Sequence, residues 1–294
     1  MLSFEEFEVE LIKALNIRYP ETKIFKRQVI RINEVKQGIE IQRKDGVSAV
    51  IYPDNLYRGY EESESFEFVM EAIDTAVEFE SILAFKGILR NWDMVRPYLK
   101  PYIINLDMNR EFLLENHCIY RERLNFAYGC YIDLPGTKTG DSGIVNVTRE
   151  LLKYWGITEE EAFQIAESNV VYEFSPIRVT VLKLMGVEEI DGEIKEDDDM
   201  FVLTTPNRVR GASGIFDTNF IHQKAEELQT NFYILPSSIH DLVLLKEAVA
   251  PTNDMLKTMV KEINKTHVLP EDYLADTVYY YDREKKKVEI VDWV

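Results

Sequence analysis

The chain has 294 residues, of which 46% are hydrophobic and 12% aromatic, so it has enough apolar material for a packed core and is not a disordered chain. It holds 52 acidic and 34 basic residues, which give a formal net charge of −18. A chain this acidic is a poor general binder of nucleic acid and of anionic membranes. These values favour a folded globular protein and exclude general nucleic-acid binders.

The sequence shows no sign of export, of a membrane span or of a metal site. Its first residues lack the basic start and apolar run of a signal peptide, and no apolar stretch reaches about 18 residues. Cys118 and Cys130 match no metal-ligand spacing and are too few for a disulfide framework. We therefore expect a cytoplasmic protein with no metal and no cofactor, whose cysteines pack as small apolar side chains.

The first hundred residues predict a small domain of order α-β-β-β-α. Ser3 and Glu6 form a capping box that opens a helix, and Pro20 closes the segment. Three strand-like runs and one long helix follow. The predicted strands are 29–32, 39–41 and 47–52, and the predicted helix is 66–90. We expect this domain to cover residues 1–96.

The remaining residues, 97–294, predict a larger mixed domain in which a β-β-α unit recurs. Its first part contains predicted strands at 103–106, 124–133 and 144–147, and predicted helices at 110–114, 148–155 and 158–166. Its second part contains predicted strands at 201–204, 212–216, 232–235 and 242–245, helices at 219–228 and 252–264, and a closing hairpin of 277–281 with 288–291. The expected fold class is therefore α+β.

The negative charge is concentrated in two runs. Residues 59–85 carry a net charge of −8 and residues 184–207 one of −7. A short like-charge block that contains a glycine usually forms a solvated loop, so we expect an acidic linker near residues 186–200, between two halves of the larger domain. The first run places a stripe of carboxylates at helical spacing, which consists of Glu67, Glu71, Asp74 and Glu78.

Several segments resemble a known family. They are "VIYPDNLYRGYE", "GIVNVTRELLKYWGITEEEAFQIAESN", "TTPNRVRGASGIF", "KAEELQTNFYILPSSIHDLVLLKE" and "HVLPEDYLADTVYYYDREKKKV". Together they resemble the bacterial domain-of-unknown-function family 5688 over most of residues 30–285, and there is a weaker similarity to family 1444. The resemblance implies a cytoplasmic bacterial protein of a kind often carried on mobile elements. It assigns no activity, cofactor or catalytic residue.

One short segment contains the residue types of a hydrolase site. Ser237-Ser238-Ile239-His240-Asp241 places hydroxyls, an imidazole and a carboxylate within five residues, with Ser238 and His240 as the best pair. Triad members normally come from separate elements, and serine hydroxyls in a turn commonly bond backbone N–H groups. The segment is therefore interpreted first as a turn and second as a hydrolase site.

Two features favour binding instead. The carboxylate stripe has the chemistry of a DNA mimic that would occupy a basic DNA-binding enzyme, although its charge density is several-fold below that of duplex DNA. Tyr280 lies in a strand on the face opposite to its two tyrosine neighbours, and together with Trp293 it would suit a partner surface. Our leading hypothesis is a non-enzymatic protein that binds another, unidentified protein. A hydrolase and a DNA mimic are the alternatives.

Overall fold

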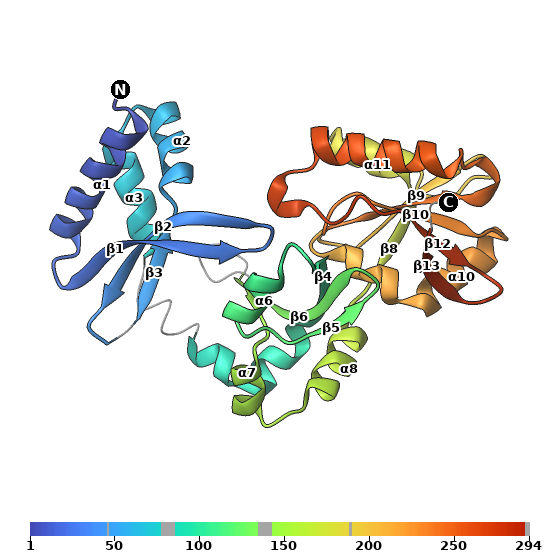
Figure 1. Cartoon of the computed structure of the whole chain (residues 1–294), viewed down its shortest axis with the longest axis horizontal. Helices are drawn as coiled ribbons and strands as arrows, with labels where there is room; N and C mark the ends of the chain where they lie inside the picture. Colours follow the sequence, from blue (N-terminus) through green and yellow to red (C-terminus); the bar gives the residue numbers. More distant parts are fainter. Residues whose placement is uncertain (46, 78–85, 135–142, 188–189, 292–294) are drawn as a thin grey trace. The chain divides into compact units, whose positions relative to one another are not determined.

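The structure is a computed structural model that describes residues 1–45, 47–77, 86–134, 143–187 and 190–291. The chain divides into two compact units, Met1–Met94 and Val95–Val294. Helices and strands are mixed in both units, and the described strands pair into three antiparallel sheets (Figure 1). This arrangement confirms the predicted α+β class.

The first unit packs helices on a three-stranded antiparallel sheet of order β1-β2-β3. Its elements are α1 (Phe4–Arg18), β1 (Thr22–Arg31), β2 (Glu34–Arg43), β3 (Ser48–Ile51), α2 (Pro53–Ser63) and α3 (Phe66–Ala76). The predicted capping box is present, because Ser3 Oγ accepts from the Glu6 N–H and the Glu6 carboxylate accepts from the Ser3 N–H. The buried side of α1 consists of Phe7, Leu11 and Leu15, which are fully buried in one cluster with Ile39 and Ile41 of β2.

Two helices of this unit differ from the prediction. The sequence predicts that residues 53–55 end the strands in a turn, yet they open α2, with Pro53 as its first residue. Proline fits that position because its fixed φ suits the first turn and its missing N–H would have no helical partner there. The predicted helix 66–90 is represented by α3, which ends at Ala76, and by a helical segment at 86–90; residues 78–85 lie outside the described part.

The first half of the second unit is a four-stranded sheet in which β5 and β7 pair with successive parts of one edge of β6, and β4 pairs with the other edge. Helix α8 packs on this sheet, and the Phe163 ring stacks on the Tyr128 ring with centroids 5.5 Å apart. Cys118 and Cys130 are buried free thiols, as predicted. The elements are α5 (Trp92–Val95), η1 (Arg96–Tyr98), β4 (Leu99–Asn105), α6 (Arg110–Glu115), β5 (Tyr120–Arg123), β6 (Phe126–Leu134), β7 (Gly143–Asn146), α7 (Arg149–Trp155) and α8 (Glu159–Asn169).

The second half of this unit is a six-stranded antiparallel sheet of order β13-β12-β10-β11-β9-β8. Helix α11 lies along one face of this sheet (Figure 1), where its Leu256 and Val260 pack with Leu235, Leu245 and Val278. The elements are β8 (Glu173–Pro176), α9 (Ile177–Leu184), β9 (Met200–Thr204), η2 (Gly211–Phe216), α10 (Thr218–Leu228), β10 (Phe232–Pro236), β11 (Leu242–Lys246), η3 (Glu247–Val249), α11 (Asn253–His267), η4 (Pro270–Asp272), β12 (Tyr279–Asp282) and β13 (Lys287–Ile290).

One predicted strand of the second unit is shifted and another is wrong. The expected strand 124–133 is β6, which begins at Phe126, because Leu124 lies in the turn between β5 and β6 with φ of 55°. The expected strand 212–216 is wrong, because Gly211–Phe216 forms the 3-10 helix η2. Residues 211–215 are all buried, so neither face of this segment is solvated as in a half-buried strand. The β-β-α order is present in β6-β7-α7 and in β10-β11-α11.

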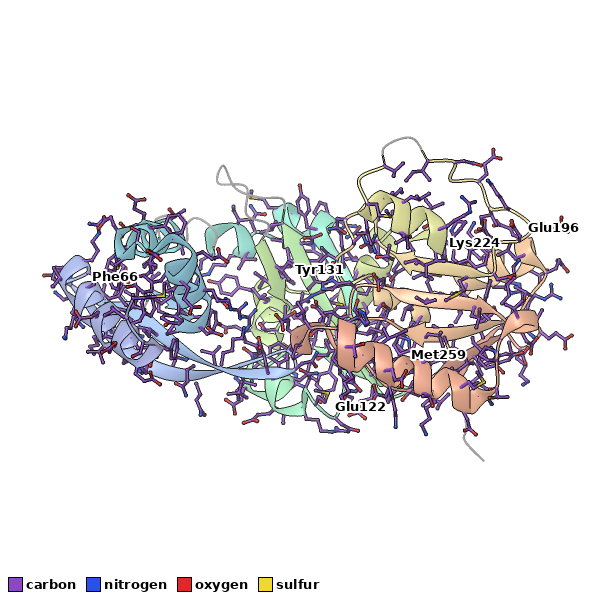
Figure 2. All side chains as sticks on the ribbon, turned by 90° about the horizontal axis from the view of Figure 1, so that it is seen from above. Phe66, Glu122, Tyr131, Glu196, Lys224 and Met259 are labelled. Atoms are coloured by element: carbon purple, nitrogen blue, oxygen red, sulfur yellow. The ribbon has the colours of Figure 1, made fainter. Side chains whose placement is uncertain are left out.

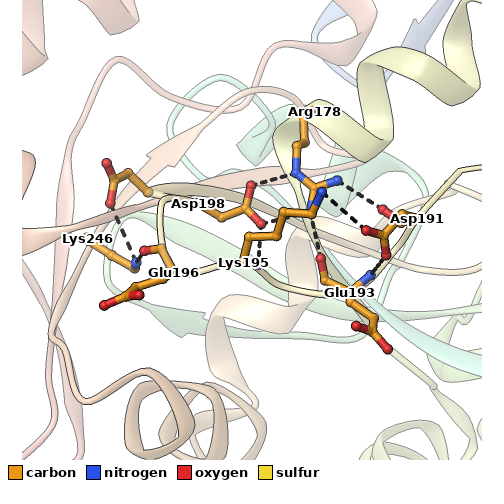
Figure 3. A network of polar contacts seen from close by, with 8 residues as sticks. Arg178, Asp191, Glu193, Lys195, Glu196, Asp198 and Lys246 are labelled. Atoms are coloured by element: carbon orange, nitrogen blue, oxygen red, sulfur yellow. Dashed lines mark hydrogen bonds and ion pairs between the residues drawn. The ribbon is translucent and has the colours of Figure 1, made fainter.

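The acidic segment 186–200 is not a linker between two halves. Strand β8 precedes it and β9 follows it, and these strands are neighbours in one sheet. The Arg178 guanidinium of α9 binds both carboxylate oxygens of Asp198, at 2.8 and 3.0 Å, and also the carbonyls of Asp191 and Glu193 (Figure 3). Arg178 therefore holds Asp191, Glu193 and Asp198 of a segment whose acidic composition predicts a solvated linker.

We expect Asp198→Asn to destabilise the protein by about 1–2 kcal/mol at pH 7, because the charge-assisted bonds to Arg178 are lost. The Arg178 guanidinium lowers the pKa of Asp198, whose carboxylate is almost fully buried. A lowered pKa contributes stability above the unfolded value of about 3.9, and this contribution disappears as the pH falls through the folded value. Urea unfolding from pH 6 to pH 3 measures it.

The difference in unfolding free energy between wild type and Asp198→Asn should therefore shrink below about pH 4. Asp197→Asn is the matched control, since it removes the same charge from an exposed neighbouring side chain. A pH-independent difference, or an equal effect of the control, would show that the bonds between Arg178 and Asp198 do not hold the loop.

Candidate interaction surface

The predicted carboxylate stripe is only partly available. Glu67 and Glu71 are exposed on α3, but Asp74 is bound by Arg18 of α1 and accepts a hydrogen bond from the Tyr19 hydroxyl at 2.6 Å. The hydrogen bonds from Arg18 are the main cause that lowers the pKa of Asp74. Glu78 lies outside the described residues. Because Asp74 joins α3 to α1, only Glu67 and Glu71 remain on the surface without an ion-pair partner in the part of the chain that the structure describes.

In the predicted aromatic surface, Tyr280 already contacts other residues of the protein. Tyr280 is half-buried; its hydroxyl donates to a Glu247 carboxylate oxygen at 2.6 Å, and its ring meets the Tyr233 ring edge-on at 5.1 Å. Tyr279 and Tyr281, on the other face of β12, are fully buried. Trp293 lies outside the described residues. Tyr280 therefore braces β12 against β10 and η3, and its hydroxyl already has a partner.

The structure does not join Ser238 to the imidazole of His240. The Ser238 hydroxyl accepts from the backbone N–H groups of His240 and Asp241, at 3.0 and 3.3 Å, as in a serine turn. The His240 ring accepts from the Arg210 N–H at Nδ1 (3.2 Å), so its proton is on Nε2, 3.0 Å from a carboxylate oxygen of Asp272. Ser238 therefore stabilises the turn of the β10–β11 connection, and His240 holds this connection against the start of η2 and against η4.

That connection leads to a residue that the sequence reasoning missed. Arg210 is 9% exposed, and its guanidinium lies between the rings of Tyr102 and Tyr131, 4.7 and 4.6 Å from their centroids. Its Nη1 donates to Asn146 at 2.8 Å. Within the described part of the chain it has no carboxylate partner, and burial lowers its pKa. No local pattern identifies it, because its neighbours come from β4, β6 and β7.

A row of exposed apolar side chains lies on α11. Met255, Met259 and Ile263 follow one another at intervals of four residues and are 57%, 40% and 46% exposed. They form a continuous row of roughly 12 Å at 1.5 Å rise per residue. Met259 is labelled on α11 in Figure 2. We call these three side chains the α11 stripe.

The α11 stripe exists because the apolar side of the helix is wider than the sheet contact requires. Leu256 and Val260, one position after Met255 and Met259, form the row that is buried on the sheet. At 100° per residue the two rows are adjacent, so one row is covered and the other is left in solvent. Both apolar rows are visible in the sequence, and together they could have indicated an unusually wide apolar face. The sequence does not show which of the two rows is buried against the sheet.

A comparison of the sequence with models of protein families identifies the family of this chain. The sequence model of a family described as "Family of unknown function (DUF5688)" matches residues 4–283, nearly the whole chain. The chain belongs to the DUF5688 family. No curated protein and no solved structure matches this DUF5688 chain.

Two further findings on the DUF5688 chain concern membrane spans and metal sites. Among the described residues, no helix is both long enough and apolar enough to cross a membrane. Over the same residues, no three histidine, cysteine or acidic side chains gather closely enough to hold a metal ion. Neither finding bears on the α11 stripe, whose exposed apolar side chains suit a partner protein.

Proposed function

We propose that this DUF5688 protein is a non-enzymatic cytoplasmic factor that binds another protein through the α11 stripe. The observation that supports the proposal is the row of Met255, Met259 and Ile263, each at least 40% exposed on one helix. Fully burying an exposed aliphatic or methionine side chain contributes roughly 1.5–3 kcal/mol. These three are about half exposed, so covering them contributes roughly half of that each, which together can anchor an interface. Methionines adapt their shape and are common on surfaces that accept a partner helix.

The charge of the chain indicates the chemistry of the partner. With a net charge of −18, two copies repel one another at long range, whereas a basic protein is attracted. We therefore propose a basic partner that inserts apolar side chains against the stripe, rather than a second copy. Its association rate should fall as salt increases, whereas the apolar contact itself should be insensitive to salt.

The triple variant Met255→Gln, Met259→Gln, Ile263→Gln is expected to weaken partner binding at least tenfold, which corresponds to a loss of about 1.4 kcal/mol or more. The unfolding free energy should change little, because these side chains are exposed. Affinity capture from host extract, followed by binding titration of the retained protein, measures the effect. A photo-cross-linking residue at position 259 should trap the same protein.

The matched control changes Leu184 and Met185 to Gln, since these residues are 71% and 73% exposed elsewhere on the same unit. The control should bind as wild type does. If it loses the partner equally, or if the stripe variant keeps it, the stripe is not the contact. Sedimentation of the pure protein tests the second-copy alternative, which predicts a dimer that the stripe variant abolishes.

The two alternative functions have their own tests. A DNA mimic would bind a basic DNA-binding enzyme through Glu67 and Glu71, so the double change of these residues to Gln, and not the stripe variant, should release the partner. A hydrolase would use Ser238 and His240, and turnover that is lost on changing both to Ala would support it. Partner binding that persists in both of these variants, and is lost in the stripe variant, supports the proposal.

A further inference from the structure

A cleft in the second unit has the size and polarity of a small-molecule site. Its volume is about 490 Å³, within the range of ligand pockets in proteins. Residues of β5, β6, α8, η2 and the first turn of α10 line it. None of these residues belongs to the α11 stripe, so a ligand in this cleft would be independent of the proposed function.

The cleft is lined by one cation, which is held by contacts with two aromatic rings and by one long ion pair. The Arg123 guanidinium lies 4.4 Å from the centroid of the Tyr128 ring and 5.4 Å from that of Phe216, and its side chain is 34% exposed. Its ion pair with Glu167 is loose, at 3.9 Å. The ring contacts hold the guanidinium, and no hydrogen bond from its N–H groups to a described residue occupies them, so they are available to an incoming carboxylate, which arginine binds with two parallel hydrogen bonds.

Two carboxylates lie in the same cleft. Glu167 accepts a hydrogen bond from the Tyr128 hydroxyl at 2.8 Å, and Asp217 accepts one from the Phe220 N–H at 3.0 Å, where it caps α10. Each bond uses one oxygen, so the second oxygen of each carboxylate has no partner among the described residues. Both carboxylates line the cleft together with Tyr172.

The remaining lining combines aromatic side chains with small polar ones. Tyr128 and Tyr172 are 2% and 8% exposed, and the Tyr172 hydroxyl bonds to Ser213 Oγ at 3.0 Å. Phe216 meets Tyr128 edge-on with centroids 5.4 Å apart. These aromatic walls suit an apolar group between the charged ends, and they stay in place when the site is empty, since each is packed or bonded within the protein.

We propose that this cleft binds a free amino acid with an apolar side chain. Its carboxylate pairs with Arg123, its ammonium group with Glu167 and Asp217, and its side chain lies against Phe216, which lines the cleft and is only partly buried. One cation and two carboxylates give the empty cleft a net charge of −1, which disfavours phosphates and other anions. A ligand that carries both an ammonium and a carboxylate matches all three charged groups.

Isothermal titration with L-phenylalanine and L-leucine tests the proposal on the full chain. We expect both to bind, and we expect phenethylamine, which lacks the carboxylate, and N-acetyl-L-phenylalanine, which lacks the ammonium, to bind at least tenfold more weakly. Arg123→Gln should abolish the preference for L-phenylalanine over phenethylamine. Asp217→Asn should weaken amino-acid binding but keep the helix cap, because asparagine also accepts at that position.

Arg149 and Glu159 provide the matched control, since they form an exposed ion pair of the same residue types at the same 3.9 Å distance outside the cleft. Arg149→Gln and Glu159→Gln should bind amino acids as wild type does. The proposal is overturned if neither amino acid binds at millimolar concentration, if phenethylamine binds wild type as tightly as L-phenylalanine, or if folded Arg123→Gln and Asp217→Asn variants retain full binding.

Discussion

Gly211→Ala is expected to destabilise the second unit by about 3 kcal/mol, the upper end of the usual cost of overpacking. A Cβ atom at this position would lie 2.6 Å from the Thr205 nitrogen and 2.7 Å from the carbonyl oxygen of His240. Both are backbone atoms, so no change of rotamer relieves the clash. Typical domains are stable by only about 5–15 kcal/mol, so the change should be plain in urea unfolding followed by circular dichroism.

Gly192→Ala is the control for this substitution. Nothing lies within 4 Å of the Cβ that it would add, so its effect should stay within about 0.5 kcal/mol. Because Gly211 opens η2, which carries Ser213 and Phe216, the Gly211→Ala variant should also lose amino-acid binding in the cleft. Equal unfolding midpoints for the two alanine variants would show that η2 can move away from β9 at little cost.

Arg210→Ala should destabilise the protein by about 2 kcal/mol. The change removes two ring contacts of the guanidinium, each contributing roughly 0.5–2 kcal/mol, and leaves the Asn146 side-chain oxygen without its donor. It also opens a space between Tyr102 and Tyr131 that the surrounding side chains fill only in part. The alanine variant no longer buries a charge that lacks a described carboxylate partner, and this gain in stability offsets part of the loss.

Arg210→Met separates packing from charge. Methionine refills the space between the two tyrosine rings without burying a charge, so we expect it to recover most of the stability that alanine loses. Guanidinium chloride is itself a salt, so urea is the appropriate denaturant for this comparison. A methionine variant that is no more stable than the alanine variant would mean that the charge and hydrogen bond of Arg210, and not its packing, account for the stability that alanine loses.

Features that depend on a few neighbouring residues agree with the sequence. Thr148 and Thr158 cap α7 and α8 through bonds to N–H groups three residues further on, and Gly156 ends α7 in the left-handed region with φ of 68°. The hairpins β10–β11 and β12–β13 lie within about one residue of the predicted ranges for most of their ends. Such features are predictable because the interacting groups are close along the chain.

Features that depend on distant residues disagree. The apolar run 212–216 has the composition of a strand, but its backbone packs against Thr204, Thr205 and His240, an approach that only glycine at 211 allows. Composition predicts a solvated linker in the acidic segment before β9, because nothing local indicates that Arg178 binds Asp198. Periodicity and composition report burial and solvation in general and do not identify partners.

The candidate sites show the same division. Met255, Met259 and Ile263 are visible as an apolar row, yet the choice of the exposed row depends on where the six-stranded sheet meets α11. Arg123 and Glu167 are far apart along the chain, and only the packing of α8 on β6 brings them into one cleft. The helical spacing places Asp74 in a solvent-facing stripe, and Arg18 removes it from that role.

The sequence by itself determined the acidic charge, the α+β class, the capped starts of α1, α7 and α8, and the hairpins, because each depends on composition or on neighbouring residues. Only the tertiary structure decided which side chains remain without a partner. Exposure of the α11 stripe, the burial of Arg210 and the charge balance of the Arg123 cleft all result from contacts between distant segments. The exposed side chains of the α11 stripe and the charged groups of the Arg123 cleft support the two proposals, since a partner or ligand binds groups whose contacts within the fold are incomplete.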